Sequence, residues 1–136
     1  MRIYLLGPML LLLMLVLLSA QTEFSVRGKF ECYQEFTFKI GLQEFESDSW
    51  HVIVVNEGTS VNNTAEFAIS GNTTNPGHFQ TEQQVALVVI HTCNPNNTSE
   101  TARKFLRGLS FGKKKIVINK FNWDLHLARF EDYYDF

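Results

Sequence analysis

The sequence predicts an all-β fold, a two-sheet β-sandwich of seven to eight short strands. Short apolar segments recur along the chain, and most of them alternate apolar with polar residues, the period of a half-buried strand. Twelve phenylalanines supply bulky side chains for the space between two sheets. Only residues 42–50 hint at a helix, so folds that alternate strands with helices are disfavoured.

The composition excludes several classes of protein. A length of 136 residues suits a single domain and is too short for a multidomain enzyme, a channel or a transporter. The formal charge of −2 gives no reason to expect nucleic-acid binding. Two cysteines are too few for a cysteine-dense scaffold, so hydrophobic burial must build the core.

The first 20 residues have the order of a secretory signal peptide. Arg2 supplies an early positive charge, residues 9–18 are entirely apolar, and the small Ser19 and Ala20 precede a polar segment. The apolar run is shorter than the roughly 20 residues that a membrane-spanning helix needs. We expect cleavage after Ala20, secretion, and one domain over residues 21–136; the alternative is an uncleaved signal anchor.

Two alternating segments open the mature chain. Residues 24–32 place apolar side chains at every second position and Ser, Arg, Lys and Glu between them. Such alternation puts the apolar set on one face of a strand and the charges on the other. Residues 36–42 repeat the pattern, which predicts a second strand.

Three further segments predict strands in the middle of the chain. Residues 52–55 form a β-branched run that we expect to end at the turn-type sequence of residues 56–58, Asn-Glu-Gly. Residues 67–69 form a short strand that leads to Gly71. Residues 85–90 are apolar throughout, which is typical of a strand covered on both faces.

The last third of the chain supplies the remaining strands. Residues 102–109 carry a weaker signal, because three cations interrupt their apolar pattern. Residues 116–118 are β-branched, and residues 121–127 alternate again with Phe121, Trp123 and two leucines. We expect all these strands to form face-to-face antiparallel layers around one core.

Four asparagines match the N-glycosylation pattern Asn-x-Ser/Thr, and all lie in polar stretches between apolar runs. They are Asn62, Asn72, Asn96 and Asn97. In a secreted chain these stretches would leave a glycan in solvent, and we expect only one of the adjacent pair to be used. The alternative is that these asparagines only form turns.

The two cysteines, Cys32 and Cys93, each stand at the end of a predicted strand. In an oxidising compartment a disulfide between them would close a loop of about 60 residues, worth roughly 4 kcal/mol in the chain-entropy model. The alternative is two unpaired buried thiols. We expect the disulfide.

Seven cations and no anion occur between residues 103 and 120, a set that we call the basic segment. Its members are Arg103, Lys104, Arg107, Lys113, Lys114, Lys115 and Lys120. The functional interpretation is a patch for anionic lipid headgroups or sulfated glycans. The alternative is that these lysines and arginines protect strand edges from pairing with other sheets.

The sequence contains no recognisable catalytic or cofactor motif. The four histidines, His51, His78, His91 and His126, have no metal-protease or paired zinc-ligand spacing. His91 and Cys93 could begin a metal site, but no second ligand pair accompanies them. Because nucleophile, phosphate-loop and dinucleotide motifs are also missing, we expect a protein that is not an enzyme and needs no cofactor.

Segments along most of the mature chain match, in order, the segments of one known family. Residues 26–32 are similar to a VxGxLxC first strand, residues 65–74 to GEFELSGSTT, and residues 85–94 to LKIYHDCN. Residues 103–104 and 113–127 are similar to closing RKV and INL strands. As an ordered set they resemble the transthyretin-like family of secreted nematode proteins.

The resemblance implies an eight-stranded sandwich of two four-stranded sheets and a function in binding. Some members of the family bridge anionic lipid on dying cells to a receptor, so an extracellular protein receptor or an anionic lipid or glycan surface is the implied partner. The resemblance also allows a carrier of a small apolar ligand held between subunits. Hydrolase relatives, which open a urate oxidation product, end in Tyr-Arg-Gly-Ser, whereas this chain ends in Tyr-Tyr-Asp-Phe.

Overall fold

The structure, a computed structural model, describes residues 22–46, 49–73, 85–107, 115–128 and 131–135, so the predicted signal peptide lies outside the described residues. These residues form eight strands, and none of them belongs to a helix that could cross a membrane. The strands are β1 (Glu23–Glu31), β2 (Thr37–Glu46), β3 (Ser49–Thr59), β4 (Thr64–Asn72), β5 (Val85–His91), β6 (Glu100–Arg107), β7 (Lys115–Asp124) and β8 (Asp132–Asp135).

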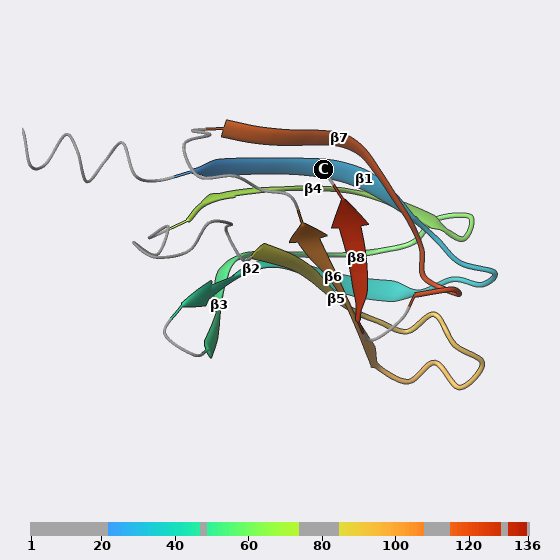
Figure 1. Cartoon of the computed structure of the whole chain (residues 1–136). Coiled ribbons are helices and arrows are strands. Elements are labelled where there is room, and N and C mark those ends of the chain that lie inside the picture. Colours follow the sequence, from blue (N-terminus) through green and yellow to red (C-terminus); the bar gives the residue numbers. More distant parts are fainter. Residues whose placement is uncertain (1–21, 47–48, 74–84, 108–114, 129–130, 136) are drawn as a thin grey trace, which may run out of the picture.

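The strands form two facing sheets, which confirms the predicted all-β sandwich (Figure 1). One sheet has the order β4-β1-β7 and the other the order β3-β2-β5-β6-β8. The implied division into four and four strands is therefore wrong. The expectation of antiparallel layers also fails at two places, because β7 runs parallel to β1 and β8 runs parallel to β6.

The core fills the space between the sheets with alternate side chains from each strand. Phe30 of β1 is fully buried, and its ring centroid lies 4.5 Å from that of Phe67, 4.8 Å from Phe38 and 6.0 Å from Trp123. Each such side chain contributes roughly 1.5–3 kcal/mol by leaving water. The predicted phenylalanine-rich layer between the sheets is thus confirmed.

The hint of a helix at residues 42–50 is wrong. The described part of this stretch belongs to the β2–β3 hairpin, in which Phe45 stands opposite Trp50. Leu42 and Glu44 face the core while Gln43 and Phe45 face the other way, a two-residue period.

The predicted turn at residues 56–58 is also wrong, because β3 continues through them to Thr59. Gly58 serves packing here: a Cβ atom at this position would lie 2.8 Å from the Phe38 ring. The chain turns later, where Asn62 and Asn63 adopt positive φ angles of 55° and 65°.

The end of the chain differs from prediction in two ways. Residues 116–124 belong to one strand, β7, and the two leucines predicted to extend it, Leu125 and Leu127, follow the strand end. The acidic segment at residues 132–135 forms an unpredicted strand, β8, whose Tyr133 ring packs 5.5 Å from Phe105 of β6.

Candidate binding surfaces

Cys32 and Cys93 form a disulfide at one end of the sandwich, with their Cα atoms 6.0 Å apart. The bond joins the end of β1 to the end of β5 and so ties the two sheets together. Gln34 reinforces this end, because its Nε2 donates to the Asn94 carbonyl at 2.6 Å and to Asn97 Oδ1 at 2.8 Å. The predicted disulfide is confirmed.

His91, which was a candidate to begin a metal site, has a structural role. Its side chain is buried, and its Nδ1 accepts the Cys93 N–H at 3.0 Å. Burial lowers the pKa of His91, against a smaller opposing effect of the Glu100 charge. Because Cys93 is in the disulfide, this pair offers no metal site, and no group of three or more potential ligands gathers elsewhere among the described residues.

The four predicted glycosylation sites all have exposed side chains. Asn62 and Asn97 occupy positive-φ turn positions, and Asn72 ends β4. The turn at Asn62 is held by Glu35, whose carboxylate accepts the Ser60 hydroxyl at 2.5 Å and the Asn63 N–H at 2.8 Å. These hydrogen bonds lower the pKa of Glu35. Glycosylation stays a prediction.

The structure divides the basic segment between the two sheets. Arg103 and Arg107 lie on the outer face of the five-stranded sheet, while Lys104, on the inward row of β6, lies at the open edge between the sheets. Lys115 and Lys120 belong to β7 in the other sheet and are exposed. Lys113 and Lys114 lie outside the described residues. The segment is therefore not one continuous patch among the residues described.

Two cations of β6 are already paired within the molecule. Lys104 Nζ lies 3.9 Å from Asp132 of β8 and about 5 Å from the ring centroids of Phe121 and Trp123. Arg107 donates to both oxygens of Asp135, at 2.8 and 3.1 Å. The acidic C-terminal strand thus neutralises part of the charge that predicted an anion-binding patch.

Four aromatic rings form a row across the outer face of the five-stranded sheet, which we call the aromatic strip. Phe45, Trp50, Phe105 and Tyr133 follow one another with centroid separations of 5.4 to 5.5 Å. The strip borders a depression of about 340 Å³. The sequence does not predict the aromatic strip. The outward row of β6 does alternate cations with Phe105, but only the cations of this pattern indicate a binding surface in the sequence.

Arginines accompany two rings of the strip. The guanidinium of Arg107 lies 4.1 Å from the Tyr133 centroid, and that of Arg103 lies 5.7 Å from the Trp50 centroid. Arg103 Nε is buried and has no hydrogen-bond partner among the described residues. A cation over an aromatic face is attracted by the ring quadrupole, so the arginines and rings form one stable surface.

Aliphatic side chains extend the aromatic strip across the same outer face. Val52, Val55 and Ile90 are 55%, 50% and 43% exposed. Val55 and Val88 meet over Gly41, since a Cβ atom on that glycine would lie within 4 Å of both. The prediction that residues 85–90 are covered on both faces therefore holds at the buried Ala86 and fails at Ile90.

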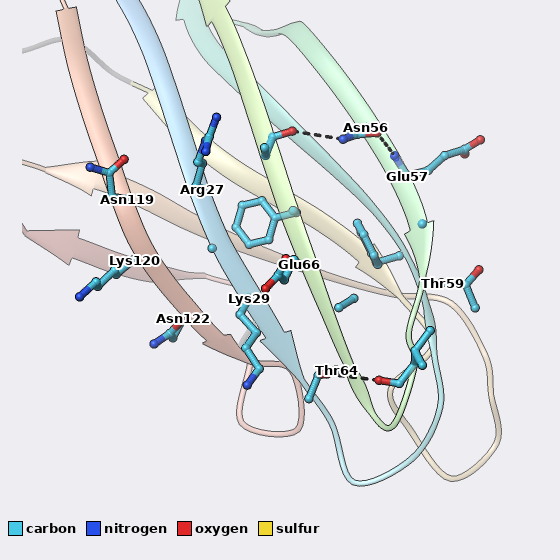
Figure 2. A pocket seen from close by; sticks show the side chains of 17 residues that line it. Arg27, Lys29, Asn56, Glu57, Thr59, Thr64, Glu66, Asn119, Lys120 and Asn122 are labelled. Atoms are coloured by element: carbon cyan, nitrogen blue, oxygen red, sulfur yellow. Dashed lines mark hydrogen bonds between the residues drawn. The ribbon is translucent and has the colours of Figure 1, made fainter.

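A polar groove of about 890 Å³ lies along the other sheet and its border with β3 (Figure 2). Arg27 and Lys29 of β1 and Lys120 of β7 line it, together with Asn119 and Asn122. Glu66 of β4 stands beside Lys29, and the Asn56–Glu57 stretch of β3 lines the opposite side, where the Glu57 side chain points away from the groove. Of this set the sequence predicts a binding role only for Lys120, because alternation places Arg27 and Lys29 on the solvent face of a strand.

No family model, curated protein or solved structure matches the chain.

Proposed function

We propose that the protein is a secreted binding protein of the transthyretin-like family, which bridges an anionic lipid or glycan surface to an extracellular protein receptor. The outer face of the five-stranded sheet carries the proposal, because it is apolar although it points away from the core. An exposed sheet face normally carries polar side chains, and an apolar patch on it is typical of an interaction surface.

The composition of this face suits a protein receptor. Tryptophan, tyrosine and arginine are the residues that most often dominate the binding energy of protein interfaces, and the aromatic strip together with its two arginines supplies all three. Ion pairs border the apolar centre on two sides, Lys39–Glu57 at 4.0 Å and Arg107–Asp135 at 2.8 Å. An apolar centre with a polar rim is the usual anatomy of such an interface.

Arg103 indicates the charge of the receptor surface. Its guanidinium lies at the strip, and the buried Nε lacks an acceptor among the described residues. Arg103 as a whole is partly exposed, so a receptor carboxylate would pair with its guanidinium charge in a dry environment, where a charged hydrogen bond is strong. We therefore infer a receptor with an apolar surface that carries an acidic side chain opposite Arg103.

The bridging function also needs a second surface that faces elsewhere. The cations of the polar groove lie on the outer face of the three-stranded sheet, so the two surfaces point in opposite directions from the sandwich (Figure 1). One face is then free for an anionic surface while the other holds the receptor.

Saturable binding of the labelled mature protein to cells tests the receptor surface. Val55→Lys places a charge in the apolar centre, and we expect it to weaken binding by about ten-fold or more, since burying an unpaired charge is costly. Val117→Lys is the matched control, because Val117 is 49% exposed on the outward row of β7. Equal binding by the two variants, or binding that survives protease treatment of the cells, would contradict a protein receptor at this face.

The second candidate is a carrier of a small apolar ligand at a subunit interface. The depression beside Trp50, Phe105 and Tyr133 favours it, because a concave site that combines aromatic rings with polar groups is typical of ligand sites. Light scattering of the eluting protein separates the two proposals. A dimer that Val55→Lys dissociates would favour the carrier, whereas a strict monomer excludes a site between subunits.

A further inference from the structure

We propose that the polar groove on the three-stranded sheet binds an anionic oligosaccharide, one that carries sulfate or carboxylate groups. The inference rests on the proposed function, since it assumes an extracellular protein, and it chooses between the two anionic surfaces left open there. Two observations carry it: a β-bulge that turns Lys120 outward, and the cations and amides gathered beside it.

The bulge lies where β1 pairs with β7. Val26 stands opposite Ile118, and Gly28 stands opposite Phe121, so two residues, Asn119 and Lys120, face the single Arg27. The burial along β7 shows the consequence, because Ile118 and Phe121 are buried while both residues between them are exposed. In a regular strand the side chain of Lys120 would point into the core. The extra residue instead places it on the outer face, on the same side as Arg27.

Gly28 shows that the bulge is built into the packing of the two strands. A Cβ atom at this position would lie 1.9 Å from the backbone oxygen of Phe121, far inside contact distance. The bulged strand can approach β1 this closely only because residue 28 has no side chain. Bulges are frequent next to functional sites, where they change the direction of a side chain.

The bulge brings together cations and amides on one surface. Lys29 follows Arg27 by two residues and so lies on the same face of β1. It stands opposite Asn122 of β7 and opposite Glu66 of β4. Figure 2 shows Arg27, Lys29 and Lys120 along one side of the groove and Asn56 and Glu57 along the other. Lys29 Nζ lies 3.4 Å from a carboxylate oxygen of Glu31, so Glu31 neutralises part of the Lys29 charge. Arg27 and Lys120 form no ion pair among the described residues.

This combination of side chains suits a sugar chain better than a membrane. Arginine and lysine bind sulfate or carboxylate groups, while amides and carboxylates exchange hydrogen bonds with hydroxyl groups. The carboxylate of Glu66 would repel the continuous negative charge of an anionic bilayer, whereas a sugar chain can present a hydroxyl group to it. Val61, at 71% exposed, is the single large exposed apolar side chain among the residues found to line the groove, which leaves little to insert among lipids. The volume of about 890 Å³ lies within the range of ligand sites.

A size-fractionated heparin octasaccharide is the probe, measured by titration calorimetry against the full mature chain. We expect Arg27→Gln and Lys120→Gln each to weaken binding by about five- to ten-fold, because each removes a charged contact. The matched control is Arg107→Gln, an exposed arginine on the opposite sheet that is paired with Asp135, and it should change affinity by less than about two-fold. Unfolding midpoints measured on all variants confirm that each protein is folded.

Two further arms separate the possible outcomes. Vesicles with about 30% anionic lipid should bind more weakly than the octasaccharide at the same salt concentration, and neutral dextran should not bind. Vesicle binding without octasaccharide binding would overturn the glycan site and leave the bridging function standing. Octasaccharide binding that Lys120→Gln and Arg107→Gln weaken equally would overturn the groove as the site. Loss of cell binding in Val55→Lys with octasaccharide binding intact would support the site and show that the two surfaces act separately.

Discussion

At the scale of single residues, the close contact between Gly28 and Phe121 gives the sharpest test of the packing. We expect Gly28→Ala to lower the free energy of unfolding by about 3 kcal/mol or more, because its Cβ meets backbone that cannot give way without opening β1 from β7. Gly41→Ala is the control, since its nearest neighbour is the Val88 side chain at 3.2 Å, and it should cost less than about 1 kcal/mol. Urea unfolding measures both. Equal effects would contradict the account of the bulge.

His91 gives the fold a dependence on pH. Its pKa in the folded protein lies below the unfolded value of 6.5, so between the two values the unfolded chain binds more protons. Stability is therefore fully present above pH 6.5 and falls as the pH drops towards the folded pKa. Urea unfolding from pH 5 to 8 measures this, and His91→Asn should flatten the curve relative to the exposed His126→Asn. A profile that the two substitutions change equally would assign the dependence to other groups.

Glu35 acts in a separate and more acidic range. The Ser60 hydroxyl and the Asn63 N–H lower the pKa of Glu35 below the unfolded value of 4.5. The stability that Glu35 contributes is therefore fully present above pH 4.5 and is lost as the pH falls towards the folded pKa. A loss of stability between pH 6.5 and 5 is therefore attributed to protonation of His91, and a loss below pH 4.5 includes protonation of Glu35.

At the scale of elements, the disulfide joins strands that belong to different sheets. The two cysteines are 61 residues apart, and closing such a loop in the unfolded chain contributes roughly 4 kcal/mol in the chain-entropy model. We expect the double substitution Cys32→Ala, Cys93→Ala to lower the free energy of unfolding by about that amount. Reduction of the native protein should lower stability similarly, and a stability unaffected by both would contradict a structural role.

Strand β8 is held by packing more than by its ion pairs. The Arg107–Asp135 pair is largely exposed, so Asp135→Asn should cost less than about 1 kcal/mol. Tyr134 packs its ring 5.1 Å from Phe121 and is part of the core boundary, so Tyr134→Ala should cost more, about 2 kcal/mol. Thermal unfolding of the two variants ranks these contributions. A larger effect of Asp135→Asn would show that charge holds the strand.

The alternation of apolar and polar side chains predicts where most of the strands lie, but it does not predict which strands pair with each other. The core positions of β1 and β2 were readable, because one face of each is apolar and the other is charged. The place of β8 depends on Phe105 meeting Tyr133 and on Arg107 meeting Asp135, two pairs that are each 28 residues apart, and the bulge depends on a backbone contact at Gly28. Neither contact leaves a periodic signal in the sequence.

At the scale of the whole molecule, the candidate surfaces arise from residues that are distant in the chain. The basic segment is visible in the sequence because its cations occur in one stretch without an anion, but the fold places Lys104 at the sheet edge and Lys120 in the other sheet. Arg27 joins Lys120 only through the parallel pairing of the first and seventh strands. The pairing of two strands that lie near opposite ends of the chain cannot be inferred from runs of charge. The polar groove could therefore be identified only from the structure.

The sandwich keeps the aromatic strip and the polar groove on opposite outer faces, which makes their effects on binding independent. Val55→Lys should weaken cell binding and leave octasaccharide affinity within about two-fold, and Lys120→Gln should do the reverse. In the double variant the two free-energy changes should add within about 0.5 kcal/mol, because the two substituted residues lie on the outer faces of different sheets. A bridging assay, in which the protein joins heparin-coated beads to cells, should fail with either substitution. Bridging that survives one of them would mean that both partners bind a single face, because a bridge across the sandwich needs both surfaces at once.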